Sequence, residues 1–144
     1  MRPFVLSIFL SAAALTLPVA AETVATPIAT GQFVDADQRH QGAGTATLAQ
    51  TDDGRTFLQF VEDFAVTPGP DLEVWLVVDD APATSAAVLE SEYLSLGPLQ
   101  SPEGAQTYEV PSSVIASDYG SVVIWCEDFS VLFSVATFTP ATDS

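Results

Sequence analysis

The sequence predicts an all-β protein: a small antiparallel β-sandwich or barrel in a single domain, with at most one short helix. Two observations predict this fold. Short segments that alternate between apolar and polar residues follow one another, and turn signals such as Asp52-Asp53-Gly54 and Pro68-Gly69-Pro70-Asp71 separate them. The chain has 144 residues, of which 48% are hydrophobic, which suits one folded core and is too apolar for a disordered protein.

The strands are expected, in chain order, at Gly44–Ala49, Thr56–Phe60, Leu72–Val78, Gln106–Val110, Ser121–Glu127 and Val131–Phe138. The first is rich in small residues and threonine, and the second follows the tight-turn signature Asp-Asp-Gly. In the third, every second residue from Leu72 to Val78 is aliphatic, and the other face carries Glu73, Trp75 and Val77. Because that second face is half apolar, we expect this strand to be central in its sheet. The last two strands come from the most apolar part of the chain.

One helix is expected, at Ala81–Glu92. This segment is rich in alanine, and Pro82 suits the first turn of a helix. Its serine and threonine residues weaken the helical pattern.

Two segments resemble each other and predict two equivalent corners between strands. Phe60–Val66 reads FVEDFAV, and Trp125–Val131 reads WCEDFSV. In each corner we expect the acidic pair to face solvent, while Phe64 or Phe129 returns to the core. Where the first copy has valine, the second has a cysteine.

Residues 1–21 are expected to be a secretory signal peptide. Arg2 supplies the positive charge, Phe4–Leu17 the apolar run, and Val19 and Ala21 the small residues before a cut between Ala21 and Glu22. An uncleaved membrane anchor is the alternative, but the run is shorter than the roughly 20 residues of a spanning helix. We therefore expect an exported protein, periplasmic or secreted, with a flexible tail at 22–30, the β domain at 31–140 and a C-terminal tail at 141–144.

The charge balance disfavours two classes of partner. Loss of Arg2 with the signal changes the formal net charge from −16 to −17, and the mature chain then has 19 acidic residues against Arg39 and Arg55. Such a surface repels nucleic-acid phosphates and anionic lipids, so we expect neither nucleic acid nor a membrane as partner after cleavage. It attracts cations or a basic protein surface. The alternative is that the charge serves only solubility.

The composition also excludes self-contained metal centres of the common types. The mature chain has one histidine, His40, one cysteine, Cys126, and no methionine. Blue-copper sites need two histidines and a cysteine, c-type haem needs CxxCH, and iron–sulfur clusters need several cysteines. A structural zinc site needs four cysteine or histidine ligands. The cofactor, if any, remains unknown, and we expect no metal ligands in the chain.

Cys126 is the main candidate for chemistry, because a lone thiol in an exported protein cannot form an internal disulfide. Strand alternation places it on one face with Val122 and Ile124, and places Trp125 on the other. One interpretation is a small buried hydrophobic residue. Another is a reactive thiol, for which His40 and the two arginines are the only positive neighbours available. A third is a hydrolase that pairs Cys126 with His40 as its base.

Four segments together resemble the DM-thirteen domain family, described as an electron-transfer domain. They are GQFVDADQRHQGAGTATL (Gly31–Leu48), FVEDFAVTPGPDLEVWL (Phe60–Leu76), LGPLQSPEGAQTYEVP (Leu96–Pro111) and DYGSVVIWCEDFSVLFSVA (Asp118–Ala136). The set GPDL, LGxL, GxQxYxxP and VxIWCxxFSVxF is specific and covers essentially the whole mature domain. The resemblance implies an extracytoplasmic β-rich domain, often beside haem- or sugar-binding modules of the DOMON type. It also implies that Cys126, in the IWC motif, is the redox residue.

These observations predict an exported redox or electron-transfer module that acts through Cys126 and is not a classical enzyme. Trp125 is expected to wall the site, and His40 to be a proton partner. With a single domain, the electron donor has to be a separate redox protein or a small molecule. The alternative is a binding module without catalysis, in which Cys126 only packs the core. The hydrolase requires Cys126 and His40 within hydrogen-bond reach.

Overall fold

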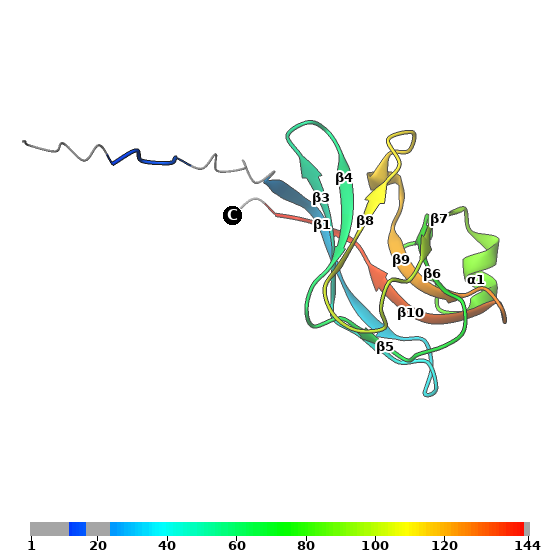
Figure 1. Ribbon diagram of the computed structural model, residues 1–144. Helices are drawn as coiled ribbons and strands as arrows, with labels where there is room; N and C mark the ends of the chain where they lie inside the picture. The colour runs from blue at the N-terminus through cyan, green and yellow to red at the C-terminus, as the bar shows by residue number, and fades with distance from the viewer. Residues whose placement is uncertain (1–11, 17–23, 143–144) are drawn as a thin grey trace, which may run out of the picture.

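The computed structural model describes residues 12–16 and 24–142 and is mostly β, as the sequence predicts (Figure 1). The expected signal cleavage point between Ala21 and Glu22 lies outside these residues. The strands are β1 (Ala25–Asp35), β2 (Gly42–Ala43), β3 (Thr45–Thr51), β4 (Thr56–Phe60), β5 (Ala65–Val66), β6 (Leu72–Val77), β7 (Tyr93–Pro98), β8 (Gln106–Val110), β9 (Ser121–Cys126), β10 (Val131–Thr137) and β11 (Thr139–Pro140). The helix α1 spans Ser85–Glu90, and a 3-10 turn spans Ala116–Asp118.

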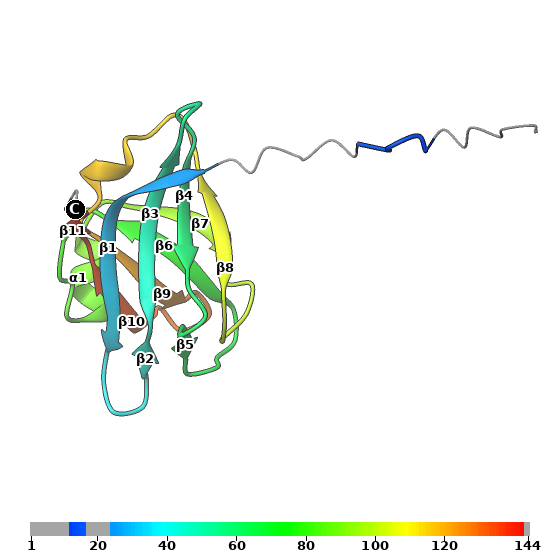
Figure 2. The same ribbon diagram turned by 90° about the vertical axis from the view of Figure 1, so that its left-hand side faces the viewer.

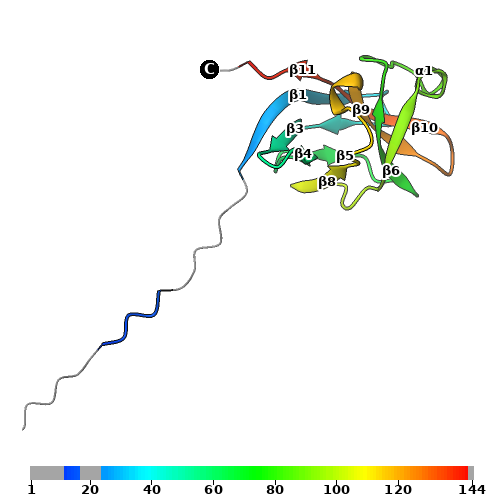
Figure 3. The same ribbon diagram turned by 90° about the horizontal axis from the view of Figure 1, so that it is seen from above.

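Eight of the strands form one antiparallel sheet that curls into a nearly closed barrel (Figures 2 and 3). Their order is β7-β6-β9-β10-β1-β3-β4-β8, and the edge strands β7 and β8 contact each other. The strand β11 pairs with β1, and β2 pairs with β5 in a separate two-stranded ribbon. The expectation that Leu72–Val78 forms a central strand is confirmed, since β6 pairs with β7 on one side and β9 on the other.

Two apolar clusters lie on the two faces of this sheet. The inner cluster fills the barrel, and β9 contributes Val122, Ile124 and Cys126 to it. The outer cluster lies on the other face of β6, β9 and β10, and contains Trp125 and Val88 of α1. The alternation expected along β6 and β9 is therefore confirmed, and it explains why β9 is buried on both faces.

The expected flexible tail at 22–30 is wrong from Ala25 onward, because β1 begins there. This strand lies between β10 and β3 in the sheet, and Ala25–Gln32 pairs with β3. Pro27 has no N–H to donate and lies at a register shift, so the sequence of this strand lacks a regular alternation and did not predict it. At the other end, Pro140 pairs with Ala29, so the strand β11 closes onto β1.

The expected helix at Ala81–Glu92 is too long at both ends. It begins after Thr84, whose hydroxyl accepts a hydrogen bond from Ala87 N at 3.1 Å and so caps the helix. Thr84 and Ser85, which weaken the helical pattern, are the cap and the first residue of the observed helix. It ends at Glu90 because the chain enters β7, an edge strand that the sequence pattern did not predict.

The two similar corners fold differently. Phe64 is 1% exposed and packs in the inner cluster, as expected. Phe129 is 70% exposed, so its expected return to the core is wrong. The reason is the connection: β9 and β10 pair from Cys126 to Val131, so residues 127–130 form a hairpin loop beyond the ends of both strands. Ser130 has a φ of 52°, which turns the chain back at once.

Candidate functional site

The thiol of Cys126 lies at the end of β9, inside the barrel. The side chain is fully buried and is a free cysteine. Its neighbours across the sheet are Leu72 on β6 and Val131 on β10. The Sγ atom donates a hydrogen bond to the carbonyl oxygen of Pro70 at 3.1 Å. The one polar atom of the side chain is therefore satisfied in an apolar environment.

The turn around Pro70 covers the thiol and is attached to the same strand end. Glu127 N donates to the carbonyl oxygen of Asp71 at 3.0 Å, next to the bond that Cys126 makes. Asp71 has a φ of 50°, the left-handed conformation that lets the chain turn from this segment into β6. Hydrogen bonds to two successive carbonyls, those of Pro70 and Asp71, thus fix the turn over the sulfur.

On the outer side of this turn lies a surface pocket of about 290 Å³. Pro70 lines it, so the residue whose carbonyl accepts the bond from the thiol also forms part of the pocket wall. The other lining residues are Arg39, His40, Thr67, Pro68, Gly69, Phe129, Val131 and Phe133. Phe129, which the corner leaves exposed, is part of this wall. We call this the Pro70 pocket.

His40 is held in the Pro70 pocket by an acid and an aromatic ring. Its Nδ1 lies 2.8 Å from Oδ2 of Asp37, and its ring lies against Phe133 with centroids 4.4 Å apart. The backbone N–H groups of Arg39 and His40 donate to Oδ1 of Asp37 at 2.7 and 2.9 Å. The bond from the His40 ring, with these backbone bonds, lowers the pKa of Asp37 below its ordinary value of 3.8.

The structure brings two of the three predicted site residues to one region and leaves the third elsewhere. Cys126 and His40 lie on the two sides of the Pro70 turn. Trp125 points to the outer face of the sheet, so it does not wall the thiol. In the described part of the chain, Cys126 bonds to Pro70 and His40 to Asp37, and no hydrogen bond joins the two. This arrangement disfavours the hydrolase.

Sequence reasoning missed Pro70 and Glu73. The role of Pro70 comes from a backbone carbonyl 56 residues away from Cys126, which no side-chain pattern reports. Glu73 accepts a hydrogen bond from Trp75 Nε1 at 2.7 Å. That contact had a signal, since the two residues lie two apart on the same face of an expected strand.

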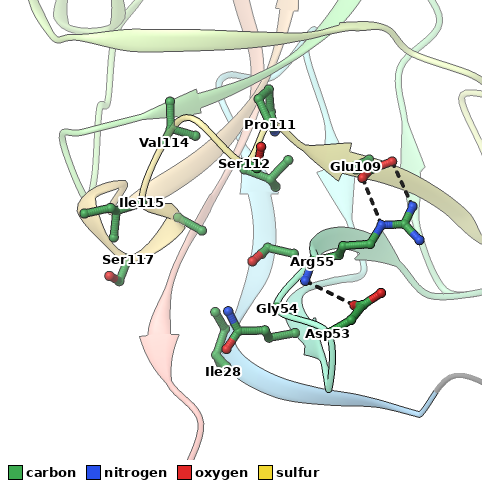
Figure 4. Close-up of a pocket in the computed structure, with 14 residues that line it drawn as sticks. Ile28, Asp53, Gly54, Arg55, Glu109, Pro111, Ser112, Val114, Ile115 and Ser117 are labelled. Carbon is green, nitrogen blue, oxygen red and sulfur yellow. Dashed lines mark hydrogen bonds and ion pairs between the residues drawn. The ribbon is translucent and has the colours of Figure 1, made fainter.

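A larger pocket, of about 430 Å³, lies at another place on the barrel, by the turn between β3 and β4 and the segment after β8 (Figure 4). Arg55 crosses its rim and makes a two-point ion pair with Glu109, with Nε–Oε1 and Nη2–Oε2 both 3.1 Å. Apolar side chains such as Ile115 form the facing wall. Among the residues that the structure describes, the lining holds apolar, charged and hydroxyl side chains, and it includes no cysteine, histidine or aromatic residue.

The described residues contain no cluster of three or more histidine, cysteine, aspartate or glutamate side chains that could hold a metal ion. None of the helices in residues 12–16 and 24–142 is long and apolar enough to cross a membrane.

Fold and site together define a small antiparallel β-barrel domain with one buried free thiol beneath a surface pocket. The chain belongs to the family described as electron transfer DM13, whose model matches residues 32–138. The resemblance found in the sequence is thus confirmed, and membership of this family suggests an electron-transfer module. Comparisons with curated proteins and with solved structures gave no match.

Proposed function

We propose that this domain is an exported electron-transfer module whose redox residue is Cys126, reached through the Pro70 pocket. The observation that carries the proposal is the hydrogen bond from Cys126 Sγ to Pro70, a residue that also lines the pocket. A displacement of one short turn exposes the sulfur, while the barrel remains intact. Family membership supports electron transfer as the activity.

The proposed step is the one-electron oxidation of the thiol by an oxidised metal centre of a partner protein. The S–H bond breaks, one electron goes to the partner, and the sulfur is left as a thiyl radical. The proton leaves toward the Pro70 pocket, where the His40 imidazole is the group suited to accept it. Between electron-transfer events, burial protects the free thiol from oxidation in an oxidising compartment.

The partner is expected to be a separate redox protein with a basic surface. The mature chain carries a formal charge of −17, which steers cationic surfaces toward it and repels nucleic acids and anionic lipids. Export, to the periplasm or beyond the cell, rests on the signal pattern of residues 1–21.

A binding module is the second candidate, and two observations favour it. Cys126 is fully buried and satisfied, as a packing residue is. The pocket of Figure 4 is larger than the Pro70 pocket and lies outside the thiol region. In this case the cysteine has no chemical role, and a small ligand binds beside Arg55.

The rate of thiol labelling in the folded protein separates the two candidates. The redox proposal predicts that a maleimide labels Cys126 faster than the whole barrel unfolds, with the unfolding rate measured on the same sample. Phe129→Ala should speed labelling, because Phe129 lines the Pro70 pocket. Ile115→Ala is the matched control, since that exposed side chain lines the other pocket. Labelling only at the rate of global unfolding, in all variants, contradicts the proposal and leaves the binding module.

A further inference from the structure

Three aromatic rings form a continuous stack on the outer face of the sheet. Tyr93 stacks on Trp75, with ring centroids 4.0 Å and planes 4° apart, and Trp75 stacks on Trp125 at 4.9 Å and 24°. The stack runs from β7 across β6 to β9, which are neighbouring strands. Trp125 is 1% exposed and Tyr93 is 46% exposed. The stack therefore joins the interior of the fold to the surface.

A carboxylate holds the middle ring of this stack. Trp75 Nε1 donates to Oε2 of Glu73 at 2.7 Å, and the hydroxyl of Ser95 donates to the same oxygen at 3.1 Å. The register explains the cluster, because Glu73 and Trp75 share a face of β6 and Ser95 pairs with Trp75 from β7. A neutral acceptor would also satisfy the indole N–H. A carboxylate can in addition take the proton away.

The middle ring is also shielded from water. Trp75 is 4% exposed, and Val88 of α1 packs in the same cluster. The helix is fastened over this face, since Leu132 N donates to the hydroxyl of Ser85 at 2.9 Å. A charge created on the indole ring would lie in an apolar environment, where an unpaired charge is costly. The group placed to prevent that charge is Glu73.

We infer that Trp75 is a one-electron relay, that Glu73 is the base that accepts its indole proton, and that the electron leaves the domain through Tyr93. This inference rests on the proposed electron-transfer function and adds the route that the electron takes, while the proton of the thiol leaves toward the Pro70 pocket. Trp125 connects the relay to Cys126, its neighbour in the chain, whose thiol lies on the other face of β9.

The relay step balances in protons and electrons. Trp75 gives one electron, through Tyr93, to a high-potential one-electron oxidant such as the oxidised metal centre of a partner protein. Its Nε1–H bond breaks, an O–H bond forms on Glu73, and Trp75 becomes a neutral indolyl radical. One electron from the reductant, which in the proposed function is the Cys126 thiol, then restores the indole. The proton returns from Glu73 to Nε1.

Flash photolysis with tris(bipyridine)ruthenium tests the relay directly. Its photogenerated trivalent form is a one-electron oxidant, and its positive charge favours encounter with this acidic protein. We expect a neutral tryptophan radical in the absorption and paramagnetic resonance spectra, formed more slowly in heavy water. Glu73→Gln keeps an oxygen that can accept the indole bond but removes the base. It should slow formation of the neutral radical by about a hundredfold, the lower range for a positioned base, and abolish the solvent isotope effect.

Three further variants make the outcome decisive. Trp75→Phe should abolish the neutral radical, and Tyr93→Leu should lower its yield. Tyr119→Phe, a tyrosine outside the stack, should change nothing. An unchanged radical and isotope effect in Glu73→Gln, with the melting temperature preserved, would overturn the inference. Cys126→Ser distinguishes the two proposals: the relay still forms its radical in this variant, whereas only the labelling experiment reports on the thiol.

Discussion

The Cys126 thiol donates a hydrogen bond to the Pro70 carbonyl at 3.1 Å, across 56 residues of chain. The bond fixes the turn before β6 onto the end of β9. It also makes the cysteine a polar participant in the core, since the buried sulfur donates to a backbone carbonyl. The consequence is a stability effect that separates two substitutions of similar size.

Cys126→Ala should destabilise the domain more than Cys126→Ser. Alanine leaves a cavity about the size of the sulfur and removes the donor to Pro70, and each loss costs on the order of 1 kcal/mol. Serine keeps a donor at the same place and loses mainly apolar volume. Urea unfolding of both variants and of the parent measures the difference. Equal destabilisation by the two variants would show that the Pro70 bond contributes nothing.

Gly69→Ala should disturb both stability and the position of His40. A Cβ atom at Gly69 would lie 2.7 Å from Cε2 and Cζ of Phe133, which is too close for any ordinary contact. Because Phe133 packs against the His40 ring, a shift of one moves the other. We expect a loss of about 1–3 kcal/mol and altered His40 ring resonances in NMR spectra.

The matched control for this variant is Gly54→Ala. Gly54 has a φ of +85°, but no atom lies within 4 Å of its Cβ position. The control therefore strains the backbone without touching Phe133, and His40 should keep its resonances. Unchanged resonances in both variants would mean that Phe133 absorbs the clash without moving the histidine.

Phe64→Ala and Phe129→Ala test the unequal corners. Phe64 is packed against Phe33 and Phe60, with ring centroids 5.1 and 4.5 Å away, so its truncation should cost about 3–5 kcal/mol. Phe129 is 70% exposed, and its truncation should change stability by no more than about 0.5 kcal/mol. Thermal or urea unfolding of the two variants and the parent measures both losses of stability. Similar losses in both variants would mean that Phe129 packs in solution.

The fold was predictable from the sequence where side chains alternate and unpredictable where the backbone decides. In β6 and β9 the two faces carry distinct residues, so the alternation of side chains along the strand assigned Val74, Trp75 and Cys126 to the correct faces of the sheet. In β1, Pro27 and small residues obscure the alternation, although the strand lies between two others. Phe129 was misplaced because its segment resembles that of Phe64, whereas the length of the hairpin decides its position.

For the candidate site, the sequence could name residues but not their neighbours. Cys126 and His40 were recognisable as rare residue types with distinctive chemistry. Their separation by the Pro70 turn depends on a backbone carbonyl and a left-handed Asp71, neither of which leaves a periodic pattern. The bond between Glu73 and Trp75 could have been predicted from the sequence, because the alternation that predicted the strand places both side chains on one face.

Asp37→Asn should remove a contribution to stability that depends on acid pH. The pKa of Asp37 is below its ordinary 3.8 in the folded protein, mainly because of the His40 bond. A depressed folded pKa stabilises the fold above pH 3.8, and this contribution is lost as the pH falls through the folded value. Unfolding free energies at several pH values compare the variant with the parent. Because Asp37 is exposed, we expect the two curves to converge in strong acid and to differ modestly at neutral pH.

Tyr108→Phe should remove a contribution to stability that is lost at alkaline pH. Burial raises the pKa of Tyr108 above its ordinary 10.0, and the bond from Gln100 N, at 2.8 Å, offsets part of that rise. A raised folded pKa contributes stability that is complete below pH 10.0 and is lost as the pH rises through the folded value.

The phenylalanine variant should therefore show less alkaline destabilisation than the parent. At neutral pH it should be less stable, because Gln100 N loses its acceptor and the hydroxyl no longer donates to Oε1 of Gln106 at 2.7 Å. Each of these two hydrogen bonds is worth about 0.5–1.5 kcal/mol. Urea unfolding between neutral pH and pH values above 10.0 measures both effects. Tyr93→Phe is the control, since its ring is 46% exposed and lies on the outer face. Identical alkaline slopes for the parent and Tyr108→Phe would mean that another group governs the loss of the fold at high pH.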